Sequence, residues 1–279
     1  MNARALAEGL HPYLLEPIPT ERERLALQAS MWEPAAERLF DALGPIDGWS
    51  CVDLGCGAPG VLGTLARRVG STGRVLGVDS DRILLEHAQA WARREGLTRV
   101  ALRQGDAYAT GLPDGAFDLV HARFMFAPLG RADALLAEMH RLVRPGGFLV
   151  IQEPDASAWQ CSPPSPAFAA LVAAIVRVFA DGGGDFDCGP RMHALLRRSG
   201  CVQVGMRAEA LALSGAHPYA RLPLLFAESL ALKLAARLGE AALIALRADC
   251  AAACADADAR VTSFVLQQSW GQKAKPLTR

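Results

Sequence analysis

The sequence has no excess of either charge, because 29 lysine and arginine residues balance 29 aspartate and glutamate residues among 279 positions. Without a net positive field, the chain has no general attraction for nucleic acid or for an anionic lipid surface. Long hydrophobic runs are also missing: FAALVAAIV at 168–176 ends at Arg177, well short of the ~20 residues of a membrane span. Glu8 and Glu16 lie where a signal peptide would need an apolar run. We therefore expect a cytoplasmic protein with no nucleic acid and no membrane among its partners.

Paired cysteine motifs are absent as well. The seven cysteines are odd in number and scattered, and no two of them stand in a C-x-x-C arrangement. This pattern predicts neither a disulfide framework nor a zinc site, and it fits a reducing compartment.

The chain does contain a regular alternation of short apolar runs and helix-like segments. Five runs read as strands, at 50–55, 74–79, 99–104, 117–122 and 147–153. Helical patterns between them include 80–96, with Ser80 as a possible N-cap and Gly96 as a stop. Another is found in 131–147, where Pro145 ends the helical pattern. Alternating strands and helices predict a mostly parallel sheet with helices on both faces.

Two regions depart from this alternation. Residues 20–40 open with a T-x-x-E capping box at Thr20 and Glu23 and read as one or two amphipathic helices broken near Pro34. Residues 201–213 and 260–272 read as two more strands, which makes seven, and an apolar helical stretch at 219–259 separates them. We expect a core at 46–215 with 260–271, and a helical cap or substrate lid formed by 1–45 and 216–259.

The stretch VDLGCGAPG places Gly55, Gly57 and Gly60 in G-x-G-x-x-G spacing, with Asp79 about twenty residues later. This spacing suits a nicotinamide dinucleotide, but a pyrophosphate needs backbone N–H donors, and Pro59 supplies none. Asp53 adds negative charge beside the turn, which suits an ammonium or sulfonium group better. A nicotinamide site therefore remains an alternative, which requires that Pro59 and Asp53 be tolerated beside a pyrophosphate.

Four segments in order carry a resemblance: VDLGCGAPG, VLGVDSD, GDAYATGLPDGAFDLVHARF and LVRPGGFLVIQEPD, which together span about 52–155. They resemble successive motifs of class I S-adenosylmethionine-dependent methyltransferases, and most closely the quinone-biosynthesis-like enzymes that act on small molecules. The resemblance implies a Rossmann-like α/β fold, a seven-stranded sheet with a helical cap, and S-adenosyl-L-methionine as the cofactor.

The resemblance also implies roles for individual cofactor-binding residues. The methionine portion would lie against Gly55, Cys56, Gly57 and Gly60, with Asp53 near its ammonium group. Asp79, followed by Ser80, would accept hydrogen bonds from both ribose hydroxyls. Asp106 would accept from the adenine amino group, and the Ala107 N–H would donate to a ring nitrogen. Ala122 would face the sulfonium end, while Tyr13 and Gln28 could reach over the methionine carboxylate.

The residues around the methyl acceptor are less clearly marked. Methyl transfer needs a base only when the acceptor holds its proton, so catalysis can leave no motif. His121 is the candidate base, with packing inside the sheet as its structural alternative. The candidate substrate contacts are Arg123, Phe126, Glu153 and Asp155. Catechol-type relatives hold magnesium with carboxylates after the fourth strand, where this chain has HARF, so we expect no metal.

The low charge and high leucine content of the cap predict a small, apolar or aromatic methyl acceptor. Two other functions share the same motifs: a non-methylating rearrangement or cyclisation in a capped pocket, and a cofactor-binding regulatory subunit. The cap could also support a homodimer, although an apolar helical face serves an internal pocket equally well.

Overall fold

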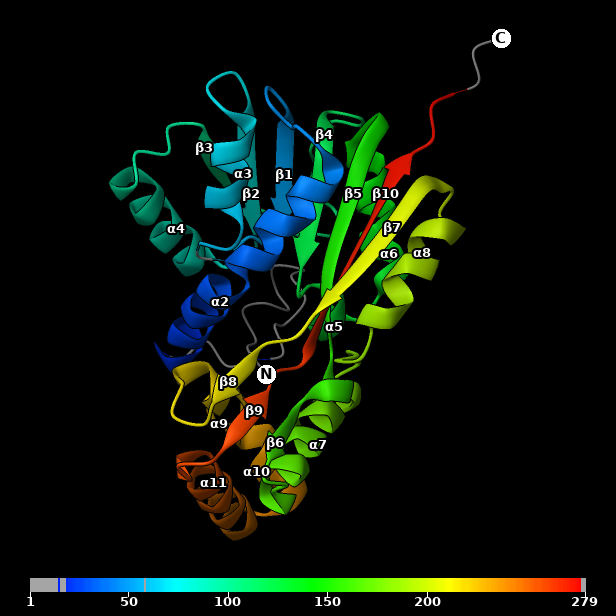
Figure 1. Ribbon diagram of the computed structural model, residues 1–279. Helices are drawn as coiled ribbons and strands as arrows, with labels where there is room; N and C mark the ends of the chain where they lie inside the picture. The colour runs from blue at the N-terminus through cyan, green and yellow to red at the C-terminus, as the bar shows by residue number, and fades with distance from the viewer. Residues whose placement is uncertain (1–14, 16–18, 58, 277–279) are drawn as a thin grey trace.

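The computed structural model describes residues 15, 19–57 and 59–276. Its main sheet has seven strands in the order β3-β2-β1-β4-β5-β10-β7 (Figure 1). The bounds are β1 Ser50–Leu54, β2 Arg74–Asp79, β3 Val100–Gln104, β4 Phe117–Arg123, β5 Val143–Asp155, β7 Cys201–Glu209 and β10 Val265–Lys273. The first five strands are parallel, and β10 is antiparallel to both of its neighbours. The predicted fold class, a mostly parallel seven-stranded α/β sheet, is confirmed.

Helices cover both faces of this sheet. One face carries α3 (Leu62–Val69), α4 (Arg82–Arg94) and the second half of α2 (Pro19–Leu43), and buried side chains of all three form one apolar cluster with the sheet. The other face carries α5 (Phe126–Leu129), α6 (Ala132–Leu142) and α8 (Met192–Arg198). The two clusters follow the alternation of the strands, since Cys51 belongs to the first and Val52 to the second.

The predicted break at Pro34 is wrong, because α2 runs through it without interruption. Trp32 before the proline and Ala36 and Phe40 after it are fully buried, so packing holds both halves in one helix. The missing N–H of Pro34 would have bonded the carbonyl of Ser30, an exposed residue whose carbonyl water can reach.

Two other local predictions also need correction. Helix α4 is capped by Asp81 instead of Ser80: its Oδ1 accepts from the N–H groups of Ile83 at 2.7 Å and Leu84 at 3.2 Å. Strand β5 is longer at both ends than the predicted 147–153, so Asp155 belongs to the strand together with Glu153.

The two C-terminal strand patterns each split into a long and a short strand. Beyond β7 and β10 lie β8 (Ala212–Ser214) and β9 (Arg260–Thr262), which join β6 (Gln160–Ser162) in a second sheet of order β6-β9-β8. The chain passes from one sheet to the other at residues 210–211 and 263–264. There the Ser263 hydroxyl accepts a hydrogen bond from the Leu211 N–H at 2.9 Å.

The second sheet packs with a group of helices beyond the carboxyl ends of the parallel strands (Figure 1). These helices are α7 (Pro166–Asp181), α9 (Leu222–Ser229), α10 (Ala231–Leu238) and α11 (Glu240–Ala255), with short 3-10 turns at Ala156–Ala158, Gly189–Arg191 and Pro218–Arg221. Among the described residues, no helix is both long and apolar enough to cross a membrane.

Candidate functional site

A cavity of about 200 Å³ opens at the carboxyl ends of β1, β2, β3 and β4, where ligands of open α/β sheets bind. The turn after β1 borders it, and Gly55, Gly57 and Gly60 all have positive φ, at +66°, +57° and +54°. A Cβ on Gly55 would lie 1.9 Å from the Met125 sulfur, and a Cβ on Gly60 would lie 2.2 Å from the Cys56 carbonyl oxygen. A Cβ on Gly57 would meet open space, so at this residue the backbone itself faces the cavity.

Three backbone N–H groups of the turn are already hydrogen-bonded within the protein. The amides of Gly55 and Cys56 donate to the Val78 carbonyl at 2.7 and 3.1 Å, and the Gly57 amide donates to Asp79 Oδ2 at 2.8 Å. Pro59 has no N–H. The turn therefore suits a ligand without pyrophosphate, as its sequence predicts.

Two carboxylates approach the cavity from the next strands. Asp79 ends β2, and its oxygens accept from the N–H groups of Gly57 at 2.8 Å and Asp81 at 2.9 Å. Burial raises the pKa of Asp79, and these two N–H groups oppose that effect. Asp106 follows β3 and accepts from the Tyr108 N–H at 2.9 Å. Both acids line the cavity, and their arrangement can accept hydrogen bonds from hydroxyl and amino groups of a ligand.

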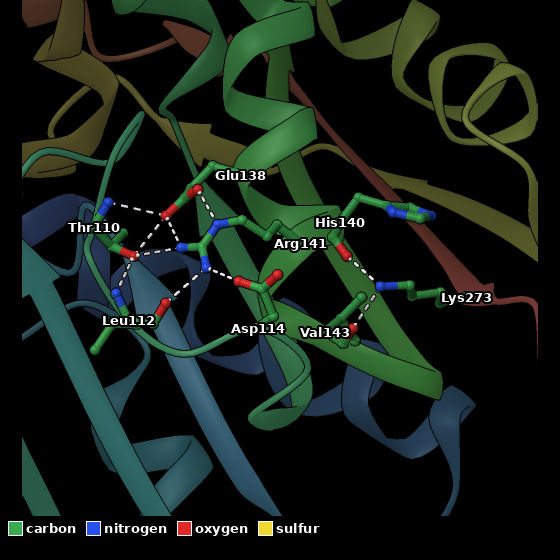
Figure 2. Close-up of polar contacts among 8 residues, drawn as sticks. All are labelled: Thr110, Leu112, Asp114, Glu138, His140, Arg141, Val143 and Lys273. Carbon is green, nitrogen blue, oxygen red and sulfur yellow. Dashed lines mark hydrogen bonds and ion pairs between the residues drawn. The ribbon is translucent and has the colours of Figure 1, made fainter.

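The loop from Asp106 to the start of β4 is tied to α6 by a network around Glu138 and Arg141 (Figure 2). Glu138 accepts from the N–H of Thr110 at 2.9 Å and from its hydroxyl at 2.6 Å, and Arg141 donates to Glu138 and to the Leu112 carbonyl at 2.7 Å. These contacts lower the pKa of Glu138 against the effect of burial. The loop that carries Asp106 is therefore anchored by helix α6 as well as by β3.

A chain of buried polar side chains crosses the sheet beneath α2. The Ala35 carbonyl accepts from Gln268 Nε2 at 3.1 Å, and the same nitrogen donates to Gln152 Oε1 at 2.7 Å. Gln152 Nε2 lies 2.7 Å from His121 Nε2, and His121 Nδ1 lies 2.7 Å from Asp53 Oδ1. The four side chains come from β10, β5, β4 and β1, which are neighbours in the sheet.

The Ala35 carbonyl determines which group donates and which accepts at each step of this series of hydrogen bonds. A backbone carbonyl only accepts, so Gln268 presents its NH₂ group there, and Gln152 must present its oxygen to Gln268 and its NH₂ to His121. His121 Nε2 is then an acceptor, and the proton of the neutral ring is on Nδ1, where it is donated to Asp53. His121 therefore holds the Asp53 carboxylate in place at the edge of the cavity.

Glu153 fixes the segment that follows β4. Its carboxylate accepts from three backbone N–H groups, those of Met125 at 2.8 Å, Phe126 at 3.0 Å and Ala127 at 3.0 Å. Complete burial raises the pKa of Glu153 to about 7, against the effect of these donors. The segment packs the Met125 side chain against Gly55, so Glu153 supports the glycine turn indirectly.

Aromatic side chains line the opposite part of the cavity. They come from the end of β4, from α7 and the loop after it, from α9 and from the β9–β10 junction: Phe124, Phe179, Phe186, Phe226 and Phe264. Their rings contact one another edge to face, with 5.8 Å between the centroids of Phe124 and Phe264 and 6.0 Å between those of Phe186 and Phe226. The cavity thus has a polar part over the glycine turn and an aromatic part beneath the additional helices.

Comparison with known proteins accords with this geometry. A family profile described as a methyltransferase domain matches residues 51–147. The nocamycin O-methyltransferase of Saccharothrix syringae is 35% identical over 129 residues, which are 46% of this chain and 46% of that protein. The demethylmenaquinone methyltransferase of Lactobacillus johnsonii is 32% identical over 118 residues, which are 42% of this chain and 48% of that protein. Residues 51–147 therefore match a methyltransferase domain.

The methyltransferase domain also has solved structural relatives. The phosphoethanolamine N-methyltransferase 2 of Haemonchus contortus, solved with S-adenosylhomocysteine, superposes with a TM-score of 0.51 over 86% of this chain and 52% of that one. At 18% identity this likeness shows the fold alone. The chain spans less than half the length of both curated relatives named above.

Most of the residues predicted to bind the cofactor of the methyltransferase domain meet at the cavity: Gln28, Asp53, Gly55, Cys56, Gly57, Gly60, Asp79, Ser80, Asp106 and Ala107. Ala122 is fully buried beside it and is absent from its lining, and Tyr13 lies outside the described residues. The open backbone at Gly57 and the two cavity-lining acids fit S-adenosylmethionine.

The predicted catalytic and substrate residues separate into two groups. Arg123 lines the cavity of the methyltransferase domain. The structure does not bring His121, Phe126, Glu153 or Asp155 to its lining; all four are buried. Both ring nitrogens of His121 are engaged, and Asp155 caps the next turn by accepting from the Ser157 N–H at 2.9 Å. His121, Glu153 and Asp155 lie within the sheet, and Phe126 begins α5.

Sequence reasoning missed several residues that line the cavity. Met125 and the five phenylalanines of the aromatic part carry no motif, because an isolated phenylalanine on a helix reads as ordinary core. The ion pair of Glu21 and Arg24 on α2 had a weak signal: two charged residues on the face of the helix that carries its apolar residues. Arg24 also lies over the Phe226 ring, at 4.4 Å from its centroid.

Proposed function

We propose that the protein transfers a methyl group from S-adenosylmethionine to a small, apolar or aromatic metabolite. The observation that carries this proposal is the cavity itself, which joins Gly57, Asp79 and Asp106 in one part to an aromatic wall in the other. S-adenosylmethionine, when bound, supplies a methyl carbon activated by the adjacent sulfonium. The protein then has to bind both molecules, align them and exclude water.

In this proposal Asp79 binds the ribose hydroxyls and Asp106 the adenine amino group. Asp53, held by His121, lies near the positive end of the methionine portion. The aromatic part binds the acceptor, and α2, α7 and α9–α11 form the cap over it. This assignment moves α7 from the core predicted by sequence into the cap, because α7 packs against α9 and α11. The homodimer and the absence of a nucleic-acid partner stay predictions.

The first test is calorimetric titration of the purified full chain with S-adenosylhomocysteine and, separately, with NADH. We expect S-adenosylhomocysteine to bind and Asp79→Ala to weaken it at least tenfold, the loss of about 1.5–3 kcal/mol expected for hydrogen bonds to a charged group. Asp47→Ala, which removes an exposed acid outside the cavity, is the matched control and should bind as wild type does. Binding of NADH alone would contradict the proposal.

The second test is a screen of acceptors with isotopically labelled methyl donor and mass analysis of the products. We expect a gain of one methylene unit in apolar or aromatic compounds. Products of unchanged mass would indicate a rearrangement in place of transfer, and methylation of polar peptides or nucleic acids alone would contradict the proposed acceptor class.

A further inference from the structure

Arg123 is a cation of the cavity that has no polar partner among the residues that the structure describes. It ends β4 and lines the cavity, and its Nη1 atom is buried with no hydrogen-bond partner. None of its side-chain nitrogens forms a hydrogen bond or an ion pair with another residue in the described part of the chain. Its guanidinium carbon lies over the Phe124 ring, 5.7 Å from the ring centroid.

An unpaired buried charge is costly, so proteins rarely keep one without a use. Burial lowers the pKa of Arg123, and the negative charge of Asp53 opposes that effect from beyond ion-pair distance. The two acids whose charges act on Arg123 are paired elsewhere: Asp53 Oδ1 with His121, and Glu33 with Arg67. Among the residues that the structure describes, no carboxylate therefore forms an ion pair with Arg123.

The position of Arg123 makes a ligand the natural counterion. Strand β4 lies next to β1, which leads into the glycine turn, and is followed directly by Phe124 of the aromatic part. Phe124 has a φ of +57°, an uncommon backbone conformation for a bulky residue and one that is found at ligand sites. Arg123 therefore lies at the junction of the two parts of the cavity, where the acceptor would meet the methyl donor.

We propose that Arg123 binds an anionic oxygen of the methyl acceptor, so that the substrates are aromatic or apolar acids. The anionic group is a carboxylate, or an enol or phenol acidic enough to ionise near neutral pH. A guanidinium presents paired N–H donors that match such oxygens, and its charge adds strength in a buried site. This inference rests on the proposed function, because it assigns the aromatic part of the cavity to the acceptor.

The lining residues agree with an ionised acceptor. No histidine is present among the described residues that line the cavity. An oxygen that has already lost its proton needs no general base: its lone pair forms the bond to the methyl carbon as the carbon–sulfur bond breaks, and the electron pair stays on sulfur. No proton moves in this step, and the product no longer carries the charge that Arg123 binds.

The test is calorimetry of the full chain saturated with S-adenosylhomocysteine, titrated at pH 7.5 with 2-naphthoate and with 2-naphthamide, its neutral analogue of the same shape. We expect wild type to bind the acid at least tenfold more tightly. Arg123→Gln should reduce this preference to less than threefold, and Arg123→Lys should keep part of it. Arg198→Gln, at an exposed arginine outside the cavity, is the matched control and should keep the full preference.

Three results would overturn the inference: equal binding of the two probes to wild type, binding of neither, or a preference that survives Arg123→Gln. A loss of affinity for S-adenosylhomocysteine in Arg123→Gln with the acid preference intact would also overturn it, because Arg123 would then bind the methionine carboxylate. Circular dichroism checks that each variant is folded. Failure of wild type to bind S-adenosylhomocysteine would instead contradict the proposed function.

Discussion

The donor and acceptor roles in the buried series of hydrogen bonds from Ala35 to Asp53 can be tested at His121. Gln152→Glu replaces the NH₂ group that faces His121 Nε2 with a carboxylate oxygen, which can only accept. His121 then needs a proton on Nε2 while Asp53 still requires the one on Nδ1. We expect a neutral ring protonated on Nδ1 in wild type and a ring protonated on both nitrogens in the variant at pH 7. Long-range proton–nitrogen NMR correlations of the imidazole distinguish these states.

Gln104→Glu is the control for this experiment, because it adds the same charge at an exposed residue outside the chain of hydrogen bonds. It should leave the His121 signals unchanged. A wild-type ring protonated on Nε2 would show that the chain has the opposite polarity, and His121 could then not donate to Asp53.

Glu153 should make the stability of the protein depend on pH. Its pKa is raised from 4.5 to about 7 in the folded protein, so the folded state binds a proton that the unfolded state has lost between these values. The contribution of Glu153 to stability is therefore present below pH 4.5 and is lost as pH rises through 7. We expect the free energy of unfolding of wild type, relative to Glu153→Gln, to fall by about 3 kcal/mol over this interval. Urea denaturation at several pH values measures it.

Glu138→Gln provides the opposite case, because the pKa of Glu138 is lowered in the folded protein. Its contribution should be present at neutral pH and lost as pH falls through the folded pKa. If the free energy of unfolding relative to both variants changed with pH in the same direction, the effect would come from the protein as a whole and not from Glu153.

At the scale of elements, the sequence predicts β1 to β4 to within one residue, because short apolar runs end at glycine or polar residues. It fails where packing overrides local preference: Pro34 lies inside a continuous helix, and β7 and β10 give way to short strands of a second sheet. The site follows the same division. Gly55, Asp79 and Asp106 lie at strand ends and are readable, whereas the phenylalanines come from segments far apart in the chain and only the fold brings them together.

The loop between β3 and β4 provides a prediction at this scale. Arg141→Met removes the donors to Glu138 and to the Leu112 carbonyl, so the loop loses part of its connection to α6 and keeps the contacts of Thr110 with Glu138 (Figure 2). We expect the affinity for S-adenosylhomocysteine to fall about threefold to tenfold, because breaking a buried hydrogen bond costs about 1–3 kcal/mol and part of this cost reaches Asp106. Amide hydrogen exchange at 109–116 should become faster.

Arg82→Met is the control for the loop, because Arg82 forms an exposed ion pair with Glu86 four residues along α4, and such pairs contribute little. It should change neither the exchange rates of the loop nor the affinity by more than twofold. An Arg141→Met variant with wild-type affinity and a faster-exchanging loop would show that the position of Asp106 does not depend on α6.

At the scale of the whole molecule, one apolar cluster joins the sheet to the additional helices. It includes Val52 and Ile151 of the main sheet together with Leu171 of α7, Phe226 of α9 and Cys250 of α11. Helix α2 strengthens this connection. Its Trp32 is fully buried and donates to the Tyr219 hydroxyl at 2.6 Å, and its Glu21 accepts from the Ser229 hydroxyl at 2.7 Å.

The continuous cluster predicts that the sheet and the cap unfold together in a single transition. Trp32→Ala should lower the free energy of unfolding by about 4 kcal/mol, the cost of a large buried cavity, and should shift the whole transition without dividing it. Calorimetry checks this result, because the measured enthalpy then equals the van't Hoff enthalpy. Leu232→Ala, at an exposed residue of α10, is the control and should shift the midpoint little. Two separate transitions in wild type would mean that the helices form an independent unit, and the cap could then open while the methyltransferase fold stays intact.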